Sequence, residues 1–381
     1  MKILRINEIC DKMSTPHLTF IFCLMIMMMS FIYFQAKAAI LPPDTIGEKK
    51  HVIQKNVDAA YKVVKSFNRI DTLYIEPQRY NYTVMLQNTN TYEYYRLNDK
   101  EGHSITFAPR TSVKIGPYFG WRWLFLGYTI DISHLGDDNT RQEFDVSLYS
   151  SKVGIDLFYH KTGDDYLIRS LDLGKDANTS AIKKVHYDGL YSSIKGFNAY
   201  YIFNHRKFSY PAAFSQSTVQ RISCGSPLIG IGYTHHTLNV DWNKLNEIIE
   251  QRLGPEINGQ HINDLGMFEK IQYTDISVSG GYAYNWVFAR NWLFASSLSL
   301  ALAYKRTKGD SQYNHFTLRN FSIKNFNLDG VGRFGLVWNN TRWYAGSSFI
   351  MHAYNYNKKE FSTNNIFGSL NIYVGFNFMK R

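Results

Sequence analysis

Cysteine, proline and charged residues are all scarce in this chain of 381 residues. Of its three cysteines, Cys10 and Cys23 fall in an N-terminal leader, so Cys224 stands alone in the remainder. A lone cysteine excludes an intramolecular disulfide and a cysteine-built metal site. Charged residues make up only 19% and prolines number only 9, which argues against an extensively disordered or collagen-like chain.

The sequence also lacks the usual marks of catalysis. Gly280-Gly281 stands among strand-like residues with no Lys-Ser/Thr helix after it, so it does not predict a phosphate-binding loop. His235-His236 is the most conspicuous histidine pair, but neighbours on a strand point to opposite faces and cannot converge on one metal. We therefore predict no catalytic residue, no metal site and no cofactor.

The N-terminus has the three regions of a secretory signal peptide. Basic residues come first, the apolar run Leu18 to Phe34 follows, and Ala36-Lys37-Ala38 forms a small-x-small cleavage pattern. We predict that residues 1–38 are a cleaved signal, with either Met1 or Met13 as the start, and that the mature protein leaves the cytoplasm. An uncleaved membrane anchor is the alternative, because the apolar run is at the lower limit for spanning a bilayer.

The mature chain keeps a positive charge. Without residues 1–38 it has 38 basic and 29 acidic residues, a formal charge of +9. An exported basic protein meets anionic lipid or polysaccharide rather than nucleic acid. The partners we predict are therefore membrane lipid, with lipopolysaccharide as a further candidate. Arg206 and Lys207, in a basic cluster beside Tyr210-Pro211, are the candidates for contact with lipid headgroups.

Residues 39–79 are predicted to contain a linker and one amphipathic helix, because apolar residues recur at helical spacing from Glu48 to Phe67. Residues 80–381 follow a different period. In 369–378, Leu370, Ile372 and Val374 alternate with Asn371 and Tyr373, which is the pattern of a β-strand with one apolar face.

Alternation of this kind occurs in soluble sandwiches and in membrane barrels alike, so the second face decides between them. Here that face is mostly Gly, Ser, Ala and Asn, which suits a crowded interior, while aromatic residues gather near the strand ends of the apolar face. We therefore place the apolar face in lipid. Polar residues that would then point into the lumen are Asp131, Asp156, His160, Arg333 and Asn371.

Connection lengths support a barrel, because outer-membrane barrels alternate short periplasmic turns with longer external loops. The C-terminal half has tight turns at 288–291 and 339–342, and longer connections at 240–273, 305–326 and 355–364. Residues 241–254, within the first of these, are predicted to form a loop or plug helix capped by Asp241.

Thirteen segments have strand character, but a barrel with both termini in the periplasm needs an even number of strands. The segments are 80–87, 91–97, 112–118, 124–133, 143–150, 152–160, 196–208, 226–238, 275–287, 292–304, 327–338, 343–354 and 365–378. We therefore predict an all-β, antiparallel up-and-down outer-membrane β-barrel of about twelve strands, preceded by one amphipathic helix. Eight, ten and fourteen strands remain alternatives.

Three functions are compatible with this sequence. The first is a structural, adhesive or narrow transport role in the outer membrane. The second is a barrel enzyme that acts on membrane lipid, which requires a Ser, a His and a polar orienting group to meet. The third is a soluble periplasmic β-sandwich that binds a ligand.

Several long runs resemble a Bacteroidetes family catalogued as domain of unknown function 4421. They are TVMLQNTNTYEYYRL (83–97), SITFAPRTSVKIGPYFGWRWLFLGYTIDI (104–132), GFNAYYIFNHRKFSYPAAFSQS (196–217) and GSPLIGIGYTHH (225–236), with Asp71–Pro77 before them. The resemblance covers most of the mature chain and implies an exported outer-membrane barrel, without assigning any catalytic residue. The last strand is similar to the terminal strand recognised by the outer-membrane assembly machinery, a further predicted partner, although Met379-Lys380-Arg381 follow Phe378.

Overall fold

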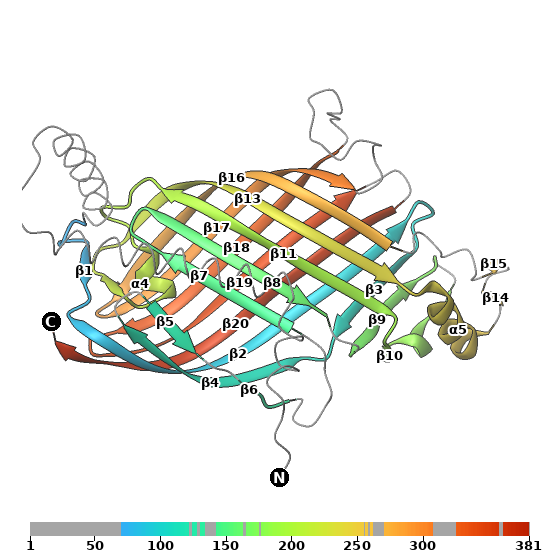
Figure 1. The fold of residues 1–381 in the computed structure, drawn as a ribbon, viewed down its shortest axis with the longest axis horizontal. Helices are drawn as coiled ribbons and strands as arrows, with labels where there is room; N and C mark the ends of the chain where they lie inside the picture. Colours follow the sequence, from blue (N-terminus) through green and yellow to red (C-terminus); the bar gives the residue numbers. More distant parts are fainter. Residues whose placement is uncertain are drawn as a thin grey trace, which may run out of the picture. The chain divides into compact units, whose positions relative to one another are not determined.

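The computed structural model describes residues 70–121, 124–127, 130–133, 142–162, 165–174, 177–254, 256–257, 260–261, 270–307, 325–357 and 361–380. The predicted signal at 1–38 and the predicted helix Glu48–Phe67 lie outside the described residues. Within them the chain is almost entirely antiparallel β-strand (Figure 1).

Twelve strands form the barrel wall in the described part of the chain, counting the short segments β5 and β6 as one strand because both pair with β4. In chain order they are β2 (Tyr80–Asp99), β4 (Ser112–Trp121), β5 (Leu124–Gly127), β6 (Ile130–Asp131), β7 (Gln142–Tyr149), β8 (Val153–Lys161), β11 (Leu190–Ile202), β13 (Cys224–Val240), β16 (Lys270–Ala289), β17 (Trp292–Thr307), β18 (Phe326–Asn339), β19 (Trp343–Asn357) and β20 (Phe361–Lys380).

Each wall strand pairs with its neighbours in sequence except at β6 and β7, and the first strand, β2, pairs along its length with the last, β20. This is an up-and-down barrel, as predicted, and the twelve strands agree with the predicted number. The alternative fold, a β-sandwich, is wrong, because the wall strands form one curved sheet around one interior instead of two stacked sheets. Between β6 and β7 the described residues show no backbone pairing, and an ion pair between Lys114 and Glu143 bridges β4 and β7 there.

The odd thirteenth segment came from dividing β2. Residues 80–87 and 91–97 are two parts of one 20-residue strand. Its polar middle keeps the strand period, because Asn90 Nδ2 donates to Asn88 Oδ1 (2.6 Å) on the outer face while Thr89 Oγ1 donates to Asn371 Oδ1 (2.8 Å) on the inner face. The middle of β2 is thus held by side-chain hydrogen bonds between polar residues, and it lacks the apolar alternation by which the other strands were predicted.

The two ends of the barrel differ. At the near end lie the N-terminus of β2, the C-terminus of β20 and the tight turns at 290–291 and 340–342, as predicted. At the opposite, far end, β13 leads into the helix α5 (Trp242–Leu253) (Figure 1). The predicted long connection at 355–364 is wrong: pairing of Asn357 with Ser362 extends both strands, so the connection is only 358–360.

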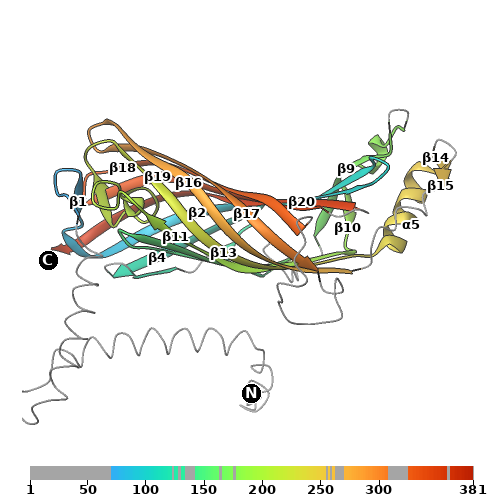
Figure 2. The ribbon, with the colours of Figure 1, turned by 90° about the horizontal axis from the view of Figure 1, so that it is seen from above.

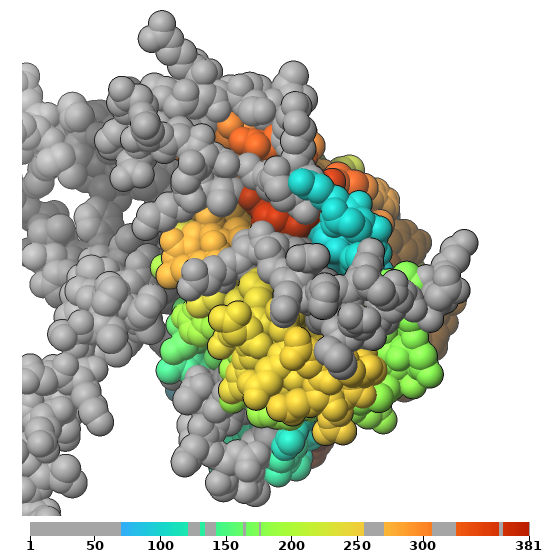
Figure 3. All heavy atoms as spheres, turned by 90° about the vertical axis from the view of Figure 1, so that its right-hand side faces the viewer, coloured from blue at the N-terminus to red at the C-terminus, as the bar shows by residue number. Residues whose placement is uncertain are grey.

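A small far-end extension continues the sheet beyond β2. It contains β3 (Ser104–Pro109), β9 (Tyr166–Asp172), β10 (Val185–Tyr187), the short helix η1 (Ser180–Ile182) and α5. Beyond α5 lies a short hairpin of β14 (Glu256–Ile257) and β15 (Gln260–His261). Figure 3 shows α5 in yellow across this end.

The far-end extension has its own hydrophobic core, which includes Phe107, Ile168, Tyr187, Leu245 and Ile249. The helix predicted at 241–254 is therefore confirmed, but it covers this core and does not plug the lumen. Its start is fixed by Asp241, whose carboxylate accepts a hydrogen bond from the Lys244 amide (3.1 Å). The Lys244 ammonium also bonds Asp188 (2.6 Å) and lowers the pKa of that carboxyl group.

Replacing Asp241 with alanine is expected to destabilise α5 by about 1 kcal/mol, because the Lys244 amide loses its capping acceptor. Faster hydrogen exchange of the α5 amides, measured by mass spectrometry, should report the change. The matched control is Asp241→Asn, which keeps the acceptor oxygen. Equal exchange in both variants would show that the cap does not hold the helix.

Candidate functional site

The barrel interior gathers the polar and titratable residues of the wall. Along each strand, alternate side chains are buried inside or exposed on the outer face, as in the run from Ile276 to Trp286 of β16. Tyrosine rings cover several inward glycines: a Cβ on Gly154 would lie 2.3 Å from the Tyr200 ring, and one on Gly375 would lie 2.1 Å from the Tyr344 ring. The small residues thus make room for aromatic side chains in the lumen.

All five predicted lumen residues take inward positions in the strand register, and each has a polar partner within the barrel. Asp131 lies opposite Lys114 and accepts from Ser112 Oγ (2.5 Å). Asn371 accepts hydrogen bonds from Gln87 Nε2 (3.0 Å) and Thr89 Oγ1 (2.8 Å). Strand alternation predicted these orientations, but it could not identify the partners, which come from other strands.

The other three predicted residues form two ion pairs. Arg333 on β18 pairs with Asp156 on β8, and both side chains are less than one-tenth exposed. His160 on β8 bonds Asp145 on β7 (2.9 Å). Four wall strands separate β18 from β8 along the ladder, so the Arg333–Asp156 pair crosses the lumen. The barrel is therefore narrow enough for side chains to span it.

A short plug, which was not among the predicted elements, closes the near end. The connection 203–223 between β11 and β13 contains α4 (Tyr210–Phe214) and β12 (Thr218–Gln220), which pairs with β1 (Ile75–Pro77) (Figure 2). Ser209 caps α4 and Pro211 lies at its first turn. The sequence Ser209-Tyr210-Pro211 was the available signal for a helix start.

Tyr210 joins the plug to three strands of the wall. Its ring lies 6.0 Å from the Tyr149 ring and 5.4 Å from the Tyr200 ring. Its hydroxyl is 2.5 Å from Ser297 Oγ on β17. The Arg333 guanidinium lies over the Tyr200 ring, 5.1 Å from its centre. The plug and the Arg333–Asp156 ion pair thus meet around Tyr200 inside the barrel.

Aromatic rings fill the middle of the lumen. Phe158 of β8 lies 5.9 Å from Phe367 of β20, and His352 of β19 stacks on Phe367 at 4.9 Å. Tyr354 packs 5.6 Å from Phe367 and 5.5 Å from His236 of β13. These contacts again join strands that are distant in the ladder.

A buried lysine forms the charged group nearer the far end. Lys305 is 1% exposed and bonds Asp329 (2.9 Å), with Asp275 at 3.7 Å. Its ammonium also lies 5.6 Å from the Tyr273 ring and 5.5 Å from the Tyr354 ring. The Lys305 ammonium thus lies close to two carboxylates, one from each adjacent strand.

The two histidines of the His235-His236 pair point to opposite faces, as predicted. His236 is buried in the lumen and stacks on Tyr273 at 4.7 Å, whereas His235 lies on the outer face beside Thr274 Oγ1 (3.0 Å). Among the described residues, no group of three or more His, Cys, Asp or Glu side chains is arranged to hold a metal ion.

The predicted headgroup residues Arg206 and Lys207 lie in the plug connection at the near end. Both side chains are exposed, and the Lys207 ammonium lies 4.8 Å from the Tyr74 ring. The strand predicted at 196–208 is wrong at both ends, because β11 covers 190–202. Asn204 ends it by turning inward and donating to the Gly225 carbonyl (2.9 Å).

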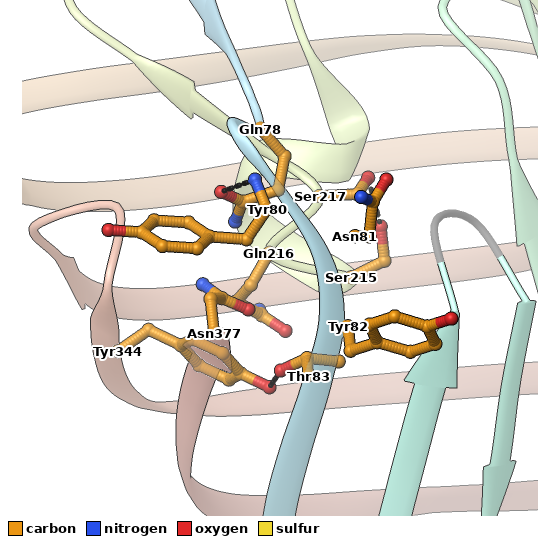
Figure 4. Close-up of a pocket in the computed structure, with 10 residues that line it drawn as sticks. All are labelled: Gln78, Tyr80, Asn81, Tyr82, Thr83, Ser215, Gln216, Ser217, Tyr344 and Asn377. Carbon is orange, nitrogen blue, oxygen red and sulfur yellow. Dashed lines mark hydrogen bonds between the residues drawn. The ribbon is translucent and has the colours of Figure 1, made fainter. Parts of the chain in front are cut away.

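A small pocket lies where the plug meets the wall at the near end (Figure 4). Thr83 and Tyr344 join across it through a 2.8 Å hydrogen bond, and Gln216 Nε2 donates to the Tyr373 hydroxyl (2.6 Å). Its enclosed space is about 10 Å³, which holds about one water molecule.

The predicted alternative of a lipid-acting enzyme requires a Ser, a His and a polar orienting group to meet, and among the described residues His160 and Ser147 both take inward positions and each bonds a carboxylate. His160 bonds Asp145, while Ser147 on the same strand as Asp145 donates to Asp156 (2.7 Å). The serine and the histidine thus have different partners. Within the described residues, no helix combines the length and apolar character needed to cross a membrane.

The fold and its filled interior define a β-barrel protein with a plugged near end. The chain belongs to the family described as Domain of unknown function (DUF4421), whose model matches residues 69–378. This confirms the resemblance found in the sequence. A comparison with curated proteins gave no match.

Several solved outer-membrane proteins are similar to the chain at low identity. The outer membrane protease OmpT of Escherichia coli is 7% identical, with a TM-score of 0.31, over 78% of this chain and 97% of that one. The toluene transporter TodX of P. putida is 8% identical (TM-score 0.22; 79% and 91% covered), and OprG of Pseudomonas aeruginosa is 10% identical (TM-score 0.21; 79% and 98% covered). TM-scores this low carry no argument about function.

Proposed function

We propose that this protein is an integral outer-membrane β-barrel that anchors the far-end extension at the cell surface, in a structural or adhesive role. The observation that carries the proposal is the apolar outer face of the wall. Its exposed residues include Leu86, Ile231, Val278, Leu300, Leu302, Leu328, Ile372 and Val374, which are 48–58% exposed. Soluble proteins rarely expose contiguous apolar patches of this kind, and in a barrel such a face lies against lipid.

Aromatic residues at the near end support this location. Trp286, Phe288, Trp292, Trp343 and Phe376 point outward close to the strand ends, and Arg342 lies 5.2 Å from the Phe376 ring. Aromatic girdles of this kind mark the lipid–water boundary of outer-membrane barrels. Since such barrels have short periplasmic turns, the near end faces the periplasm and the far-end extension faces outward.

The location is tested by fractionating cells that express the tagged protein and by comparing heated with unheated samples on a gel. Recovery in the outer membrane, with a mobility that changes on heating, is the expected result. Recovery in the soluble periplasm would refute the proposal.

Replacing Leu300 with arginine is expected to lower the stability of the inserted barrel by about 2–4 kcal/mol, because the charge would face the middle of the lipid. Urea unfolding in lipid vesicles, followed by the heat-dependent mobility shift, measures the change. The matched control is Thr237→Arg, an outward position above the apolar residues, where the cost should be about 0–1 kcal/mol. Equal costs at both positions would contradict the lipid assignment.

A narrow transport role is the second candidate. Asp145 has an inward register position, opposite Phe158, yet its side chain is 53% exposed. Water therefore reaches this inward position of β7, the strand beside the unpaired edge of the described wall. Conductance in planar bilayers separates the two roles: an anchor with a filled lumen should be silent, whereas stepwise conductance would favour transport.

A further inference from the structure

A group of basic side chains lies on the outer face of the wall at the far end. The members come from five adjacent strands and share outward positions: Lys161, Lys195, His235, Lys270 and Arg306. We call these five residues the rim patch. Lys195 and Lys270 are exposed, and the other three are half-buried.

The strand register brings the rim patch together. Lys195 lies opposite His235, His235 lies opposite Thr274, and Thr274 lies opposite Arg306. Neighbouring strands are about 4.8 Å apart, so this row extends over about 14 Å. Lys161 lies opposite Ser193, one outward position nearer the far end than this row. Lys270 lies opposite Asn239, two outward positions nearer the far end.

The rim patch begins where the apolar outer face ends. The outward row below it consists of Phe197, Tyr233, Ile276 and Tyr304, which are paired across the same four strands. Lys161 also lies 5.9 Å from the Tyr191 ring. Cations beside aromatic rings, directly above an apolar face, are placed at the level of lipid headgroups.

At this level of the wall, basic side chains face outward and acidic side chains face the lumen. The described outward positions of β8, β11, β13, β16 and β17 carry no Asp or Glu. The acidic residues of these strands, Asp156 and Asp275, point into the lumen and are buried there. The outer face therefore presents positive charge to the membrane.

We propose that the rim patch binds the phosphate groups of lipopolysaccharide in the outer leaflet. This proposal rests on the proposed function, which places the far end on the outer side of the membrane. Several cations spread over the patch suit a headgroup that carries more than one phosphate, and charge-assisted hydrogen bonds from Lys and Arg to phosphate are strong. Lipopolysaccharide is such a lipid and belongs to that leaflet.

The test is native mass spectrometry of the full protein in neutral detergent, with diphosphoryl lipid A as the probe. The triple variant K195Q/K270Q/R306Q is expected to weaken binding about 100-fold, since each cation near a membrane surface contributes about a fivefold increase in affinity. Dephosphorylated lipid A should bind the wild type weakly. Unchanged binding by the triple variant would overturn the proposal.

Two neutral substitutions in the same rows, Ser193→Gln and Thr237→Gln, control for a change of shape and should leave binding unchanged. Phosphatidylglycerol tests the source of the phosphate, and binding as tight as that of lipid A would refute lipopolysaccharide as the ligand. The heat-dependent mobility shift is recorded on the same samples. Its loss in the wild type would refute the barrel in the membrane, whereas failure of the rim patch alone would leave it intact.

Discussion

Replacing Arg333 with methionine is expected to lower the free energy of unfolding by about 3–5 kcal/mol, because the Asp156 carboxylate would remain buried without its cation. Arg333 is 2% exposed and Asp156 is 6% exposed, so water cannot compensate for the loss. Urea titration of the vesicle-inserted protein, read by the heat-dependent mobility shift, measures the change.

The double variant R333M/D156L is the matched control for this prediction. It removes both charges and is expected to recover most of the stability, since apolar residues of similar volume often replace a buried ion pair at little cost. If R333M alone were as stable as the wild type, the pair across the lumen would contribute nothing to holding the walls together.

Lys305→Met is expected to have an effect of similar size, about 3–5 kcal/mol, because a single ammonium neutralises two buried carboxylates. Asp275 and Asp329 are 1% and 4% exposed, and without Lys305 they would repel each other in the lumen. The same unfolding assay applies, with all variants compared at one fixed pH.

The control for Lys305 is the triple variant K305M/D275N/D329N, which removes the whole charged group. We expect it to be more stable than K305M alone. Destabilisation equal to that of K305M would mean that the lysine acts through packing against Tyr273 and Tyr354 and not through its charge.

The sequence predicted the wall well and its connections less well. Alternation located nearly every strand, because the polar interior on one face and the apolar outer surface on the other impose a period of two on the residues themselves. The inward orientation of Asp156 and Arg333 follows from the same period. Their pairing with each other does not, because it depends on how tightly the ladder curves, and no local pattern records that.

The plug and the far-end extension show a second limit. The burial of Tyr210 depends on Tyr149, Tyr200 and Ser297, which come from three strands, and the residues next to Tyr210 in sequence do not indicate these contacts. The apolar stripe of α5 predicted a helix correctly. Whether it entered the lumen or covered β3 and β9 depended on tertiary contacts that its period could not reveal.

The pairing of β2 with β20 determines the order in which the wall can be completed. Tyr80 lies opposite Lys380, so the first strand made waits for the last residues of the chain before its second edge is paired. Contacts between such distant residues form slowly because a long loop must close first. Until then β2 and β19 each keep an open edge, which is a template for aggregation. Deleting the final strand would therefore leave β2 and β19 each with an open edge and would not produce a smaller barrel.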